Sequence, residues 1–179
     1  MSREHFHPRE LALAGLFGAA ALALPFLFHL LQLGRVFLPM YLPLMALSFF
    51  ASPAVVAATA FVVPLLSALL TGMPPWYPPV APIMSLELLL MGALASFVWR
   101  RTGKRKWSIL AVLAPVLVLG RGLQLVMGYL LGLLLDLPPE FLSIASVAAG
   151  FPGLILMCVV IPTLVMAVQR NGSRLQETA

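Results

Sequence analysis

Charged side chains are scarce in this chain. Asp, Glu, Lys and Arg make up 9% of its 179 residues, whereas 61% are hydrophobic and the mean hydropathy is +1.03. A water-soluble domain of this size needs a larger share of polar residues to cover its surface. The composition therefore excludes a soluble domain and predicts an integral membrane protein.

Cysteine is almost absent, and so are the signatures of several enzyme classes. The one cysteine, Cys158, lies in an apolar run, which excludes an intramolecular disulfide and a multi-cysteine metal site and favours a packing role. The sequence has no GxxxxGK(S/T) nucleotide loop, no HExxH metal helix, no GxSxG nucleophile elbow and no carboxylate cluster for magnesium. We therefore expect a chain that is not an enzyme and binds no metal or cofactor.

Long apolar runs dominate what is present, and a run of roughly 17 to 25 residues suffices for a membrane-spanning helix. We predict six spans, near residues 10–31, 36–50, 53–71, 82–99, 108–135 and 141–168. The first run is too long for a signal-peptide core, so we interpret it as the first helix. The Pro-rich residues 71–79 predict a loop after the third span. Prolines at 39, 43 and 64 leave the count between residues 36 and 71 open by one.

Basic residues gather at the ends of these spans. They precede the first span, fill the link after the fourth and follow the sixth: Arg3 and Arg9, residues 100–106, and Arg170 and Arg174. With six spans, all three places lie on one side of the membrane, which the positive-inside rule identifies as the cytoplasm. We therefore predict cytoplasmic termini, and topology rather than nucleic acid accounts for the net charge of +5.

Few polar residues lie within the spans, and unpaired polar groups in hydrocarbon are costly enough to mark candidate sites. Glu87 lies near the outer end of the fourth span, and Arg121 lies about halfway along the fifth. Gln124 follows Arg121 by three residues and therefore shares its helix face. Because the two spans are antiparallel neighbours, we expect Glu87 and Arg121 to meet. The pattern leaves open whether they form a structural ion pair or contact a ligand.

Three further residues are candidates for the outer side of the bundle. Trp76 and Tyr77 lie in the Pro-rich loop, where an aromatic pair suits a membrane interface or a lid over a pocket. His29 lies near the outer end of the first span, where it adds hydrogen-bonding capacity. A single intramembrane histidine is more often a packing residue than a ligand, so both interpretations of His29 stay open.

Small residues recur at helical spacing in the first span. Ala14 and Gly18 are four residues apart, as are Gly15 and Ala19. Such stripes allow another helix to approach closely. The partner is either a helix of this bundle or a separate membrane subunit.

Several of these segments, taken in order, resemble the substrate-binding S component of an energy-coupling factor (ECF) vitamin transporter. The resemblance rests on VFLPMYLP at residues 36–43, PLLSALLTGMPP at 64–75, Glu87, GFPG at 150–153 and the pair Ile161 and Pro162. It implies a multi-pass protein of a prokaryotic plasma membrane that binds a vitamin or related micronutrient from outside. Tyr41 would then line the entrance, and Trp76 and Tyr77 would close over the ligand.

The resemblance also implies partners. In that family the first helix docks onto a transmembrane coupling protein, which carries two cytoplasmic ATPases, and this chain's small residues would provide the docking surface: Ala14, Gly15, Gly18 and Ala19. The absence of a nucleotide loop in this chain fits that division of labour. Besides these subunits, the expected contacts are the vitamin-like substrate and membrane lipid, and not nucleic acid.

The sequence alone allows more than one ligand chemistry and more than one function. Arg121 favours a carboxylate or phosphate ligand if Glu87 leaves it free, and a neutral heterocycle if the two side chains neutralise each other. A non-catalytic scaffold protein of the cell-shape type is the rival interpretation, because a short polytopic chain with few polar residues also serves that role. An enzyme acting on lipid requires a nucleophile or metal site that the sequence does not show.

Overall fold

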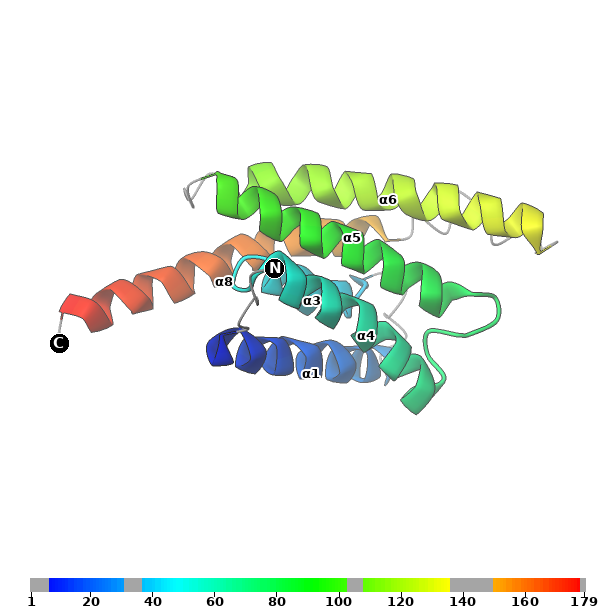
Figure 1. Ribbon diagram of the computed structural model, residues 1–179, viewed down its shortest axis with the longest axis horizontal. Helices are drawn as coiled ribbons and strands as arrows, with labels where there is room; N and C mark the ends of the chain where they lie inside the picture. The colour runs from blue at the N-terminus through cyan, green and yellow to red at the C-terminus, as the bar shows by residue number, and fades with distance from the viewer. Residues whose placement is uncertain (1–6, 31–36, 103–107, 136–149, 178–179) are drawn as a thin grey trace, which may run out of the picture.

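The computed structural model describes residues 7–30, 37–102, 108–135 and 150–177. In this part of the chain every regular element is a helix: α1 Pro8–Leu30, α3 Tyr41–Leu47, α4 Pro53–Thr71, α5 Val80–Arg101, α6 Ser108–Leu134 and α8 Phe151–Glu177. The long helices run along the long axis of the molecule (Figure 1). Five of them, α1, α4, α5, α6 and α8, contain stretches long and apolar enough to cross a membrane. The predicted all-helical fold is thus confirmed for the described residues, and the five long apolar helices are compatible with a multi-pass membrane protein.

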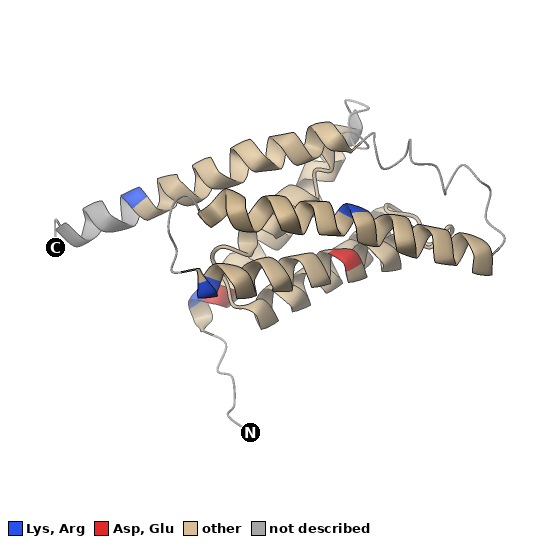
Figure 2. Ribbon diagram, turned by 90° about the horizontal axis from the view of Figure 1, so that it is seen from above, with Lys and Arg blue, Asp and Glu red and all other residues tan. Residues whose placement is uncertain are grey.

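The outer surfaces of the long helices suit lipid rather than water. Large apolar side chains are exposed on several helices, among them Leu16, Phe26, Leu69, Val118 and Leu134. Exposed large apolar side chains on this many helices are typical of a surface that faces lipid. Charged positions are few along the described helices (Figure 2), as a multi-pass membrane protein requires.

The region of the predicted second span differs from the expectation. Instead of a helix over residues 36–50, the structure has the seven-residue α3. At 1.5 Å per residue such a helix is about 10 Å long, a third of the hydrocarbon thickness of about 30 Å. Six of its seven residues are buried, and it packs against α1, α4, α5 and α8. The count of six spanning helices is therefore not confirmed. The sequence could not distinguish the two cases, because an apolar run buried inside a bundle has the same composition as one that faces lipid.

The connection between α1 and α4 nevertheless returns the chain to the end of the bundle where α1 begins. Ser52, directly before α4, is hydrogen-bonded to Glu10 in the first turn of α1. Arg100, in the last turn of α5, bonds to the same carboxylate. The start of α1, the start of α4 and the end of α5 therefore lie together, and Figure 1 shows α8 ending toward the same side.

Local sequence signals explain the ends of α4 and α5. Ser52 is extended before Pro53, which takes the first helical position, where its missing N–H is no loss. Gly72 ends α4 in the left-handed conformation, with φ of 72°, which glycine adopts without a steric penalty. Arg100 and Arg101 occupy the last turn of α5, where positive charge is favourable. Both ends thus follow from residues that the sequence displays.

Two glycines on α5 and α6 permit close packing of the central helices. A Cβ on Gly92 of α5 would lie 2.7 Å from Val56 Cγ1 of α4, inside van der Waals contact. A Cβ on Gly120 of α6 would collide with the Met91 side chain of α5. A side chain at either position would therefore require Val56 or Met91 to shift.

Some predicted features lie outside the described residues. Of the basic clusters, Arg9, Arg100, Arg101 and Arg170 are described, whereas Arg3, residues 104–106 and the side chain of Arg174 are not. The first part of the predicted sixth span, residues 141–149, is also outside, and α8 begins at Phe151.

Candidate functional site

Four polar residues from three helices meet inside the bundle. Tyr41 comes from α3, Glu87 from α5, and Arg121 and Gln124 from α6. Glu87 is fully buried, and Arg121 is 7% exposed. The Tyr41 hydroxyl donates a hydrogen bond of 2.6 Å to Glu87 Oε2, and Arg121 Nη1 donates to Gln124 Oε1. We refer to these four residues as the buried polar cluster.

Tyr41 connects the acid and the base of this cluster. Its hydroxyl binds the Glu87 carboxylate, and the Arg121 Cζ lies 5.4 Å from the centroid of its ring, within cation–π range. Within the described part of the chain, Glu87 and Arg121 form no direct ion pair, unlike Glu10 and Arg100. The sequence allowed a structural ion pair between Glu87 and Arg121. In the structure each of the two contacts Tyr41 instead.

Three polar atoms of the cluster are buried without a hydrogen-bond partner among the described residues. They are Glu87 Oε1, Arg121 Nε and Arg121 Nη2. Leaving a buried donor or acceptor unpaired costs about 1–3 kcal/mol, and more for a charged group. Ionisable side chains within a membrane bundle usually pair with one another or with backbone carbonyls, and they often mark functional sites. The cluster therefore contains one carboxylate acceptor and two guanidinium donors whose hydrogen bonds are not made by the described residues.

The close approach of α5 and α6 explains why Arg121 reaches this position. Gly120 directly precedes Arg121 and lets α6 approach Met91, which follows Glu87 by one helical turn on α5. The backbone of α6 thereby comes near the face of α5 that carries Glu87. Sequence spacing placed these two residues on neighbouring helices, and the glycine contact brings them to one place.

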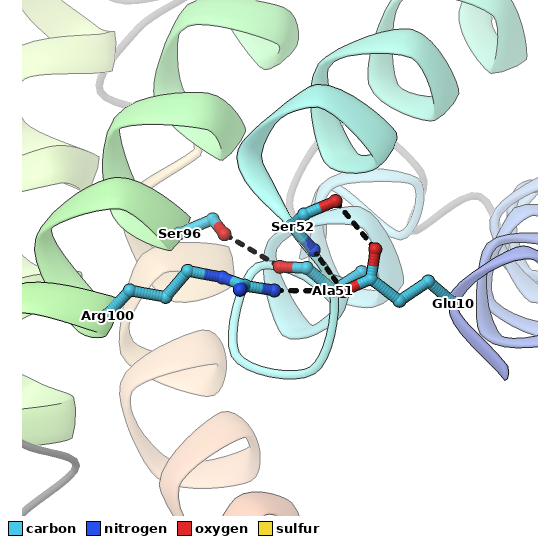
Figure 3. Close-up of polar contacts among 5 residues, drawn as sticks. All are labelled: Glu10, Ala51, Ser52, Ser96 and Arg100. Carbon is cyan, nitrogen blue, oxygen red and sulfur yellow. Dashed lines mark hydrogen bonds and ion pairs between the residues drawn. The ribbon is translucent and has the colours of Figure 1, made fainter. Parts of the chain in front are cut away.

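A second polar group ties the helix ends described above, and the sequence reasoning missed it (Figure 3). Glu10 Oε1 accepts from the Ser52 backbone N–H at 3.1 Å and from Arg100 Nη2 at 2.9 Å, and Glu10 Oε2 accepts from the Ser52 hydroxyl at 2.6 Å. Nearby, the Ser96 hydroxyl donates to the Ala51 carbonyl at 2.7 Å. We call Glu10, Ser52 and Arg100 the Glu10 clasp. The sequence did contain a signal for this contact. Glu10 lies in the first turn of α1, and Arg100 lies at a span end predicted to be on the same side of the membrane.

The other predicted binding residues do not join the buried polar cluster. Trp76 and Tyr77 lie in the turn between α4 and α5 and are 48% and 74% exposed. In the described structure, no hydrogen bond or ring contact links either one to Glu87 or Arg121. His29 belongs to the last turn of α1, and its side chain lies outside the described residues.

The small residues of α1 divide between two faces. Ala14 packs against the buried group formed by Leu47, Ala51, Val55 and Val56. A Cβ on Gly18 would lie 3.4 Å from Val63 Cγ2 of α4, so Gly18 also faces the bundle. Gly15 and Ala19 are exposed, and a Cβ on Gly15 would meet no atom within 4 Å. Gly15 and Ala19 are thus the fully exposed members of the predicted docking set, whereas Ala14 is half-buried and Gly18 is buried.

Other possible sites are less developed. A hollow of about 350 Å³, lined by Thr163, Met166, Ala167 and Arg170 of α8, shares no residue with the buried polar cluster. Among the described residues, no group of three His, Cys, Asp or Glu side chains is placed to hold a metal ion. Compared with protein-family models, curated proteins and solved structures, the chain has no match. The buried polar cluster is thus the feature from which function is inferred.

Proposed function

We propose that this chain is the substrate-binding S component of an ECF-type transporter, which captures a vitamin or related micronutrient from outside a prokaryotic cell. The observation that carries this proposal is the set of three unpartnered atoms, Glu87 Oε1 and Arg121 Nε and Nη2. A bound molecule with complementary groups would provide the missing hydrogen bonds. Small-molecule sites typically combine an apolar lining with a few such placed polar groups.

The proposed topology has six passes with both termini in the cytoplasm. The Glu10 clasp supports it, because the chain between α1 and α4 returns to the end where α1 begins. On this proposal, the chain between α1 and α4 makes the sixth pass besides the five long helices, which gives three passes in each direction. Arg9 precedes Glu10, and Arg100 and Arg101 end α5, so basic residues gather at the shared end. The positive-inside rule assigns that end to the cytoplasm.

The proposed partners are a transmembrane coupling protein and two cytoplasmic ATPases. The exposed Gly15 and Ala19 on α1 support a contact with a coupling helix, since small residues let two backbones approach. ATP hydrolysis takes place on the partner ATPases, and this chain contributes ligand recognition. The aromatic residues Trp76 and Tyr77 lie exposed on the connection between α4 and α5, at the end opposite to the Glu10 clasp, where a cover over an outward-facing site belongs.

Thermal unfolding with a panel of water-soluble vitamins tests the binding role. We expect one compound to raise the Tm of the detergent-purified protein, and the shift to disappear in Glu87→Gln. Glu10→Gln is the matched control. It makes the same change to a carboxylate of the Glu10 clasp, which contacts the last turn of α5 at Arg100 and not the buried polar cluster. A protein whose Tm no compound raises would favour the scaffold interpretation, which predicts no ligand.

A further inference from the structure

Two neighbouring nitrogens of the Arg121 guanidinium are buried without a hydrogen-bond partner among the described residues. Its Nη1 donates to Gln124 Oε1, whereas Nε and Nη2 have no partner among the described residues. In arginine, Nε–H and the neighbouring Nη2–H point in parallel and form one of the forks that bind two oxygens at once. Gln124 thus accepts from the other nitrogen, Nη1, and the two-pronged donor edge stays unpaired among the described residues.

Glu87 presents the opposite chemistry in the same cluster. Its Oε2 accepts from Tyr41, and its Oε1 has no donor among the described residues. Among the described residues Glu87 and Arg121 form no direct ion pair, and the Tyr41 side chain contacts both groups. A molecule bound at this cluster would therefore meet a double donor beside the Tyr41 ring and a carboxylate acceptor at the Tyr41 hydroxyl.

We infer that the ligand of this site, on the proposed function, is a carboxylic acid that carries an N–H or O–H donor on a second group. Its carboxylate binds the Nε and Nη2 edge of Arg121, and its donor binds Glu87 Oε1. A planar carboxylate matches the parallel spacing of that edge. A phosphate monoester carries nearly two negative charges. Arg121 is the one cation of the cluster, so a phosphate would add a surplus of negative charge beside Glu87 and is less favourable than a carboxylate.

The inference is tested by capture from a chemically treated mixture. The purified protein is dialysed against the small-molecule fraction of yeast extract, and bound compounds are released by heating and identified by liquid chromatography with mass spectrometry. Parallel dialyses use the same fraction after methyl esterification of its carboxylates, or after phosphatase treatment. We expect at least tenfold enrichment of one compound from the untreated and phosphatase-treated fractions, and no enrichment of that compound or its ester from the esterified fraction.

Two outcomes overturn the inference while leaving the binding function intact. They are enrichment from the esterified fraction, which excludes recognition of a carboxylate, and loss of enrichment after phosphatase treatment, which identifies a phosphate ligand. Enrichment of no compound from the untreated fraction would overturn the binding function itself and the inference with it.

An arginine-to-lysine pair gives an independent test. Arg121→Lys keeps the positive charge and removes the planar edge, so we expect the enrichment to fall at least tenfold. Arg101→Lys is the matched control, since Arg101 is exposed at the end of α5 and contacts Phe97, and it should enrich the compound as the unchanged protein does. Equal enrichment by Arg121→Lys would show that charge alone suffices and would overturn the inference. If Arg121→Lys does not fold, the comparison of treated fractions with the unchanged protein still decides.

Discussion

Tyr41 of α3 donates its hydroxyl hydrogen bond to Glu87 of α5 at 2.6 Å, across 46 positions of sequence. The shortest described helix therefore holds the buried carboxylate of a long one. Because α3 also packs against α1, α4 and α8, a change at Glu87 alters a hydrogen bond of a helix that contacts three others. Ligand contact at Glu87 would accordingly stabilise more than its own helix.

Removing the Tyr41 hydroxyl tests this connection. Tyr41→Phe keeps the ring beside Arg121 but leaves both Glu87 oxygens without a partner among the described residues. A hydrogen bond to a charged group contributes about 1.5–3 kcal/mol, so we expect a clearly lower Tm in the absence of ligand. Tyr77→Phe, at a side chain that is 74% exposed, should leave the Tm unchanged. Equal melting of the two variants would show that the Tyr41 bond contributes nothing.

A methyl group at Gly120 should disturb the α5–α6 interface next to the buried polar cluster. Gly120→Ala forces Cβ into the Met91 side chain, and overpacking of this kind costs about 1–3 kcal/mol. The control Gly122→Ala meets no atom within 4 Å and should be neutral or slightly stabilising. Thermal unfolding measures both. Met91→Ala should recover part of the loss in the Gly120→Ala background, and additive losses would contradict a direct collision.

The Glu10 clasp allows its bonds to be ranked. Glu10 is 19% exposed and accepts from both Ser52 and Arg100, whereas Arg100 is 46% exposed. Exposed ion pairs contribute only about 0–1 kcal/mol, so the bonds to Ser52 should matter more. We expect Glu10→Ala to lower the Tm and to speed hydrogen exchange at the starts of α1 and α4, and Arg100→Ala to do so only weakly. The reverse order would show that the ion pair dominates.

The proposed orientation predicts which residues a membrane-impermeant thiol reagent reaches. In a Cys158→Ala background, Tyr77→Cys should react with reagent added outside intact cells, and Arg101→Cys only after the membrane is opened. These two positions lie at opposite ends of α5. Labelling of both from the same side would contradict the topology, and outside labelling of Arg101→Cys alone would invert it.

The sequence predicted the long helices well, because length and apolar content are what lipid requires. Four predicted spans, near 10–31, 53–71, 82–99 and 108–135, coincide with α1, α4, α5 and α6 within a few residues. The apolar residues 36–50 misled for a physical reason: α3 is covered by other helices, and burial in protein selects the same side chains as exposure to lipid. Prolines at 39 and 43 were the visible sign of an irregular segment.

The candidate site was predictable as a set of residues but not as a geometry. Glu87, Arg121 and Gln124 stood out because acids, bases and amides are rare within apolar spans. Tyr41 was expected at an entrance, whereas its hydroxyl binds Glu87 inside the bundle. That contact depends on where the chain between α1 and α4 returns, which no local pattern specifies. Ser52 illustrates the same limit, since its hydroxyl pairs with Glu10 of another helix.

Native mass spectrometry of the gently purified protein tests the central claim most directly. The account predicts a retained vitamin-sized molecule on the unchanged protein and on Glu10→Gln, and its loss from Glu87→Gln and Arg121→Ala, because only the latter two remove groups of the buried polar cluster. Retention of the same molecule by Glu87→Gln and Arg121→Ala would place its site elsewhere and contradict the account.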